Sequence, residues 1–133
     1  MKYCCIIILA ILTSSCRQSI IDKHVAGSDS LVIHFSNSSD NSIVKTVSTT
    51  EDRAIRKLAG FVKGKKTEQF KCGYDGNLVF FSKGAKKAEI AFQYKNAACR
   101  HFVFEDNGEL VPVKMNQEAA DFLESLSSGR TFY

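Results

Sequence analysis

The chain has 133 residues, of which 44% are hydrophobic and 24% are charged, and its formal net charge is +4 at pH 7. This length suits one domain that can bury a core without help from other stabilising devices. The mild positive charge argues against nucleic acid as a partner, because proteins that bind nucleic acid carry a dense basic surface.

The first sixteen residues have the pattern of an export signal. Lys2 supplies a positive charge, an apolar run extends to Leu12, and three small residues at 13–15 precede Cys16. A charged start, an apolar run of about 7–15 residues and a small-residue cleavage site describe a secretory signal peptide. A membrane-spanning helix needs about 20 apolar residues and is the weaker interpretation.

The end of this segment resembles the cleavage site of bacterial lipoproteins, in which a peptidase cuts just before a cysteine that has received a diacylglycerol. The usual pattern is leucine, two small residues and cysteine, whereas here Thr13 stands at the leucine position and Leu12 lies one place earlier. The resemblance implies that residues 1–15 are removed, that Cys16 is lipidated, and that the membrane is a partner through this lipid. It places the protein in the cell envelope, facing the periplasm or the cell exterior. Secretion without lipid and an uncleaved anchor are the alternatives.

Residues 16–29 are predicted to carry the lipid and to form a short tether, because they are polar and almost without pattern. A single globular domain is then expected over residues 30–133. It begins with a hairpin: apolar residues alternate from Leu31 onward with the period of a half-buried strand, and residues 42–47 predict the return strand.

Two amphipathic helices are predicted, one on each side of a run of short strands. The first follows a threonine cap and ends near Gly64, and the second follows a cap at Asn116 and ends at Gly129. In both helices, apolar residues recur at i, i+3, i+4 and i+7. They are Ile55, Leu58, Ala59 and Val62 in the first helix, and Ala119, Phe122, Leu123 and Leu126 in the second.

Between the helices, short strand patterns alternate with turn residues. Because the connections are short, neighbouring strands are expected to be antiparallel, and Pro112 predicts that the last strand is an edge. The fold is therefore expected to be α+β, an antiparallel β-meander of about five to seven short strands with two amphipathic helices packed on one face. This layout resembles that of small Bacteroidetes-type envelope lipoproteins of unassigned function. The predicted strands of the middle region are residues 67–72, 77–82, 87–94, 99–105 and 109–114.

The five cysteines separate into three groups. Cys4 and Cys5 leave with the leader and Cys16 carries the lipid, so Cys72 and Cys99 remain as a pair in a compartment where disulfides persist. Two buried free thiols are the alternative. In a plain meander the pair lies at one end of the sheet but two strands apart, so a bond requires a curled sheet or another strand order.

Six lysines are expected to gather at the other end of the meander. If they share a surface, they can contact the phosphates of anionic lipid or lipopolysaccharide, each adding on the order of 1 kcal/mol. The alternative is that they occupy ordinary solvated turns, and an acidic turn at 105–106 weakens the patch further. The six are Lys63, Lys65, Lys66, Lys83, Lys86 and Lys87.

No pattern in the sequence predicts catalysis, a cofactor or a metal site. The histidines stand singly, whereas a zinc or copper site needs three or four converging ligands. Cys99 and His101 share a strand face, but no third residue orients them, and a disulfide would remove the thiol.

Two functions of different classes remain. The first is a lipid-anchored binding or structural module without catalytic activity, which recognises another envelope protein through a sheet face or an edge strand. The second is a small envelope hydrolase, or an inhibitor of one, and an enzyme predicts a pocket in which polar groups converge.

Overall fold

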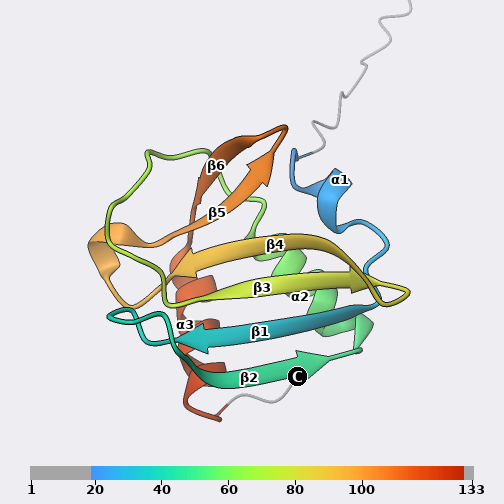
Figure 1. Ribbon diagram of the computed structural model, residues 1–133, viewed down its shortest axis with the longest axis horizontal. Coiled ribbons are helices and arrows are strands. Elements are labelled where there is room, and N and C mark those ends of the chain that lie inside the picture. The colour runs from blue at the N-terminus through green and yellow to red at the C-terminus, as the bar shows by residue number, and fades with distance from the viewer. Residues whose placement is uncertain (1–18, 131–133) are drawn as a thin grey trace, which may run out of the picture.

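The structure has an α+β fold built on one antiparallel sheet. The computed structural model describes residues 19–130, and the leader, Cys16 and residues 131–133 lie outside this described part. Within it, six strands are arranged in the order β2-β1-β3-β4-β5-β6 (Figure 1). The elements are α1 (Asp22–Val25), β1 (Ser30–Ser36), β2 (Ile43–Thr49), α2 (Asp52–Phe61), β3 (Gly76–Ser82), β4 (Ala85–Gln93), the 3₁₀ turn η1 (Ala97–Cys99), β5 (His101–Asp106), β6 (Glu109–Lys114) and α3 (Gln117–Ser127).

The predicted fold class and the antiparallel meander are confirmed, because β3, β4, β5 and β6 pair in chain order. β1 and β2 form the expected hairpin, but β1 is the strand that joins the meander, next to β3. Since β2 and β3 both run antiparallel to β1, they are parallel to each other. Parallel strands need a long crossover connection, and the segment that contains α2 provides it.

The core is one apolar cluster to which the strands and all three helices contribute. In β1, buried residues alternate with half-buried ones, as the period of the sequence predicts. Phe35 packs edge-on against Phe92 and Tyr94, with ring centroids 5.7 and 6.2 Å apart. Each fully buried phenylalanine or leucine side chain stabilises the fold by about 1.5–3 kcal/mol relative to its exposed state.

The expected tether is in part a piece of the folded domain. Residues 22–25 form α1, and Ile21 and Val25 are buried in the core. β4 and β5 pair over only three residues and then diverge, and α1 lies at the opening between them (Figure 1). Asp106 in β5 holds α1 in place, with its carboxylate 2.7 Å from Lys23 Nζ and 2.9 Å from His24 Nε2. These two partners lower the pKa of Asp106. A four-residue helix is too short to show a helical period, so the sequence predicted only a tether.

The prediction of a strand at residues 67–72 is wrong. These residues belong to the crossing loop (residues 62–75), which connects α2 to β3 without forming a strand. The loop runs along the outer edge of β6, where Thr67 N donates to Pro112 O at 3.0 Å and Lys114 N donates to Lys65 O at 2.8 Å. Pro112 therefore lies on the edge strand as predicted, and the loop covers part of that edge.

Candidate functional site

A disulfide joins the crossing loop to η1. Cys72 and Cys99 are bonded, with their Cα atoms 6.2 Å apart, as the cysteine count predicts. The sequence predicted Cys72 on a strand two strands away from Cys99, which would oppose a bond. In the structure Cys72 lies on a loop, so this obstacle does not arise. The bond holds the loop at the end of the sheet where β4 finishes and β5 begins.

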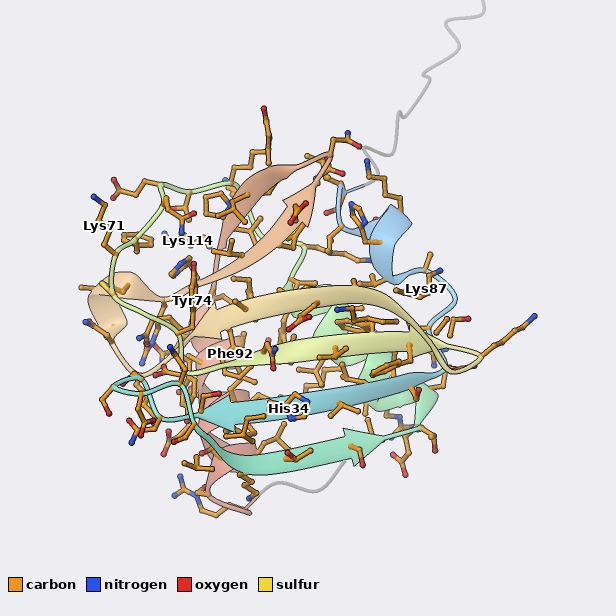
Figure 2. The ribbon with its side chains drawn as sticks, viewed as in Figure 1. His34, Lys71, Tyr74, Lys87, Phe92 and Lys114 are labelled. Carbon is orange, nitrogen blue, oxygen red and sulfur yellow. A yellow bond between two sulfur atoms is a disulfide. The ribbon has the colours of Figure 1, made fainter. Side chains whose placement is uncertain are left out.

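His101 is completely buried beneath this loop. The rings of Phe70 and Tyr74 lie 5.1 and 5.9 Å from its imidazole, and Figure 2 shows Tyr74 near this end of the sheet. His101 Nδ1 lies 2.5 Å from Cys99 O, and among the described residues Nε2 has no hydrogen-bond partner. Because a carbonyl oxygen only accepts, Nδ1 carries a proton in this contact.

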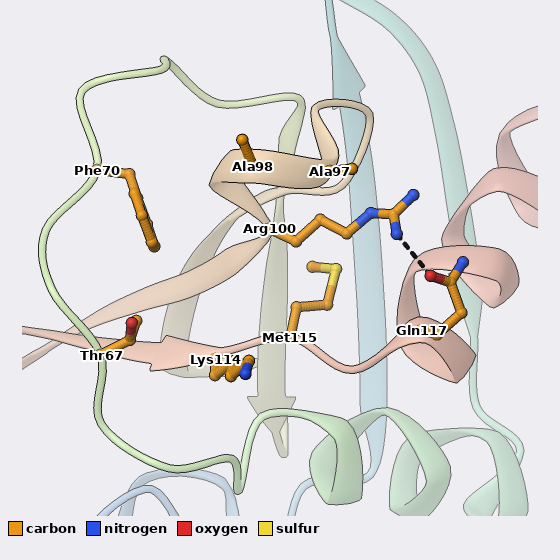
Figure 3. Close-up of a pocket in the computed structure, with 8 residues that line it drawn as sticks. All are labelled: Thr67, Phe70, Ala97, Ala98, Arg100, Lys114, Met115 and Gln117. Carbon is orange, nitrogen blue, oxygen red and sulfur yellow. Dashed lines mark hydrogen bonds between the residues drawn. The ribbon is translucent and has the colours of Figure 1, made fainter.

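A cavity of about 210 Å³ opens beside Phe70, one of the two rings that cover His101 (Figure 3). It lies between the crossing loop, η1, Arg100 just before β5, the end of β6 and the start of α3. Met115 is 4% exposed and belongs to the core, while Figure 3 shows Phe70 on the opposite side of the space. The cavity is lined by Thr67, Phe70, Ala97, Ala98, Arg100, Lys114, Met115 and Gln117.

Arg100 is fixed in this wall by two hydrogen bonds. Its Nε donates to Tyr94 O at 2.8 Å, and its Nη1 donates to Gln117 Oε1 at 2.7 Å (Figure 3). Gln117 Nε2 in turn donates to Asp121 Oδ1 at 2.8 Å. The Arg100 guanidinium therefore has no direct bond to a carboxylate, since Gln117 stands between it and Asp121. Three of its five N–H donors have no partner within residues 19–130.

Lys114 brings a second positive charge to the lining of the same cavity, beside Thr67 (Figure 3). It is exposed, and its ammonium forms no ion pair or hydrogen bond with any residue that the structure describes. The residues that line the cavity thus include two cations and no carboxylate. The helix α3 begins at Gln117, so the positive end of its dipole also lies at this cavity.

A larger groove, of about 620 Å³, lies between α1 and α2. Its charges already have partners, because Lys63 Nζ lies 2.6 Å from Asp22 and Arg56 pairs with Asp52. The smaller cavity is therefore the better candidate for a site that selects a charged ligand.

The six lysines predicted to form an anionic-surface contact occupy two places. Lys63, Lys65 and Lys66 follow α2, and Lys83, Lys86 and Lys87 lie at the β3–β4 hairpin. Lys63 pairs with Asp22, Lys86 lies 3.0 Å from Glu89, and Lys87 donates to the carbonyl of Ala26 after α1. The ammonium groups of three of the six are thus engaged with the domain itself, while those of Lys65, Lys66 and Lys83 have no partner among the described residues.

The lining of the cavity was not predicted from the sequence. Phe70 was expected on a strand, and nothing in the spacing of Arg100, Lys114 and Gln117 indicates that they meet. The one available signal was the helix cap at Asn116, which places Gln117 at a helix start and is confirmed by a 2.8 Å bond from Ala119 N. The remaining lining residues converge only because the crossing loop turns back over β5.

No group of three or more histidine, cysteine, aspartate or glutamate side chains within residues 19–130 is placed to hold a metal ion. No helix in the described part of the chain is long and apolar enough to span a membrane.

Comparison of the chain with protein-family models, with curated proteins and with solved structures finds no match.

Proposed function

We propose that this protein is an exported, lipid-anchored binding module of the cell envelope, without catalytic activity of its own. The observation that carries the proposal is the disulfide between Cys72 and Cys99. Disulfides persist in oxidising compartments and are rare in the cytosol, so this bond supports the export signal at the start of the sequence. Cys16, the proposed lipid carrier, lies outside the described residues.

The position of α1 limits the distance between the proposed lipid and the folded domain. Five residues separate Cys16 from Asp22 at the start of α1. A fully extended chain spans at most about 3.3–3.6 Å per residue, so the lipid would hold α1 within about 20 Å of the membrane. Lys63 and Lys87 would then lie on the membrane side of the domain, and their contact with anionic headgroups would require them to exchange their bonds to Asp22 and to the Ala26 carbonyl for lipid phosphates.

The cavity between the crossing loop, η1 and α3 supports a binding role over hydrolysis. Its polar groups are two cations, an amide and the Thr67 hydroxyl, without a carboxylate or imidazole to act as general base. The two described cysteines are bonded to each other, and His101 is buried beneath Phe70 and Tyr74. A small envelope hydrolase, or an inhibitor of one, remains the alternative function.

The anchor is tested by substitution of the proposed lipid site. In cells fed a radioactive fatty acid, Cys16→Ser is expected to abolish labelling of the protein and to release it from the membrane fraction. The matched control, Cys5→Ser, changes a cysteine inside the leader and is expected to leave labelling intact. Membrane association that persists in Cys16→Ser would contradict lipid anchoring and point to an uncleaved helix.

The binding role is tested by a photo-crosslinking residue placed at Ala98, on the exposed rim of the cavity. In intact cells we expect a discrete adduct from this position. The control is Ala85, another exposed alanine, at the start of β4, that does not line the cavity, and it is expected to give no such adduct. The absence of an adduct at Ala98, together with turnover of an envelope ester or peptide by purified protein, would favour the hydrolase.

A further inference from the structure

We propose that the cavity binds a carboxylate carried by a small apolar group, such as an acylated amino acid or the C-terminal residue of a peptide. This inference rests on the proposed binding function and names its ligand class. Arg100 and Lys114 would contact the carboxylate, while Phe70 and Met115 would contact the apolar body.

The charge of the cavity is the first argument. Lys23, Lys63 and Lys86 each pair with a carboxylate of the same domain. Arg100 and Lys114, in contrast, have no acidic partner within residues 19–130, although they line one cavity. Two positive charges in a concave site attract an anion, because the low-dielectric walls concentrate the field.

The orientation of Arg100 is the second argument. Its bonds to Tyr94 O and Gln117 Oε1 hold the planar guanidinium before any ligand arrives. Little conformational entropy is then lost on binding, and the free N–H donors suit the two oxygens of a carboxylate. The first turn of α3 adds backbone N–H groups and the positive end of the helix dipole at Gln117.

The apolar part of the lining is the third argument, because it restricts the kind of anion. Phe70, Met115, Ala97 and Ala98 form half of the lining residues. Inorganic phosphate or sulfate would match the cations but leave this surface unused. A neutral apolar molecule would leave the cations unsatisfied.

The size of the cavity limits the part of the ligand that can enter it. Its volume of about 210 Å³ corresponds to about seven water molecules. Pockets for drug-sized ligands are larger, at about 300–1,000 Å³. The cavity therefore suits a group the size of one amino-acid residue rather than a nucleotide or an oligosaccharide.

The test is a titration of the full chain in non-ionic detergent, followed by the backbone amide shifts of Arg100, Lys114 and Gln117. The probes are N-acetyl-leucine, its neutral analogue N-acetyl-leucinamide, and inorganic phosphate. We expect N-acetyl-leucine to bind with a Kd near 1 mM and the amide to bind about tenfold more weakly. Equal affinity for the acid and the amide, or for phosphate and the acid, would overturn the proposal, as would no shift with any probe.

Two variants assign the binding to the cations of the cavity. Lys114→Gln removes an ammonium that has no side-chain partner, so the fold is expected to be unaffected, while affinity for N-acetyl-leucine falls about fivefold to tenfold. Arg100→Gln is expected to cause a larger loss, but it also breaks the bond to Tyr94 O. The matched control is Lys66→Gln, an exposed lysine of the crossing loop outside the lining, which is expected to leave affinity unchanged. Equal effects of Lys114→Gln and Lys66→Gln would show that only net charge matters and would overturn the proposed site.

Two further peptides distinguish the source of the carboxylate. Acetyl-Ala-Ala-Leu with a free C-terminus should bind more tightly than N-acetyl-leucine if the ligand is a peptide end, and its C-terminal amide should bind weakly. Binding of N-acetyl-leucine alone would identify a small free acid. If carboxylates fail but the photo-crosslinker at Ala98 still captures a partner, the ligand class is wrong and the binding function stands. If both fail, the binding function is wrong as well.

Discussion

Removal of the disulfide between Cys72 and Cys99 is expected to lower the free energy of unfolding by an amount that the loop length determines. The bond closes a loop with a sequence separation of 27 residues, and loop-closure entropy for this length corresponds to about 3.5 kcal/mol at 25 °C. We therefore expect Cys72→Ala/Cys99→Ala to lower the free energy of unfolding by about 3 kcal/mol. For a domain of this size the midpoint of thermal unfolding should fall by about 12–15 °C.

The structure also predicts which part of the fold loses stability first. The crossing loop is held by the disulfide and by a few backbone bonds, including Thr67 N to Pro112 O. In the double variant, hydrogen exchange should accelerate more at the amides of the crossing loop than at those of the β3–β4 pair. The hydrogen bonds of that strand pair are expected to open only on global unfolding. Urea denaturation of the full chain in non-ionic detergent measures the global change, and hydrogen exchange at Thr67 measures the local one.

Two controls make this result interpretable. Wild-type protein treated with dithiothreitol should reproduce the double variant, because the same covalent constraint is lost. Ala98→Ser, an exposed change beside Cys99, should alter stability by less than about 0.5 kcal/mol. A loss below about 1 kcal/mol in the double variant, or equal protection of Thr67 with and without the bond, would refute the idea that the disulfide holds the crossing loop in place.

Two further predictions concern the packing of β3 and of α1. Gly76→Ala should destabilise the fold by about 2–3 kcal/mol in urea denaturation, because a Cβ at this position would overlap the backbone carbonyl of His34 in the neighbouring strand. Gly84→Ala, in the open turn after β3, should cost only about 1 kcal/mol, and a larger loss there than at Gly76 would contradict the packing argument. Because Lys23 and His24 lower the pKa of Asp106, the ion pair stabilises α1 above the unfolded pKa of the carboxyl, near pH 4, and is lost as pH falls through the lower folded value. Hydrogen exchange in α1 should accelerate in that range, and Asp106→Asn should accelerate it at neutral pH and remove the pH dependence; a variant that keeps the wild-type profile would exclude this role for Asp106.

Much of the secondary structure was predictable because the signals are local. Alternation around Leu31 and Ile33, the helical spacing of Ile55 and Leu58, and the cap at Asn116 each reflect residues that are close in the chain. The structure places these residues in β1, in α2 and at the start of α3. Their period is determined by backbone geometry, which does not depend on the distant parts of the molecule.

The candidate site was not predictable in the same way. Phe70 and Arg100 are 30 positions apart, and they line one cavity only because the crossing loop pairs with the edge of β6 and is bonded to η1. The loop has no period of its own, so the sequence does not distinguish residues 67–72 from a short strand. Gly64 shows the same limit: it was expected as a helix end, whereas its lack of a side chain lets the loop pass close to the backbone of Lys114.

The sequence by itself determined the pattern of the leader and the class of most elements, because each depends on residue type and near-neighbour spacing. The cysteine count made Cys72 and Cys99 the expected pair, but only the course of the crossing loop brought them together. Only the tertiary structure decided that Ile21 belongs to the core, that β1 joins β3, and that Arg100 and Lys114 line one cavity whose lining has no acid. These outcomes depend on which surfaces remain to be covered after the sheet has formed. The physical reason is that α1 and the crossing loop are held by contacts across the fold rather than by a pattern of their own.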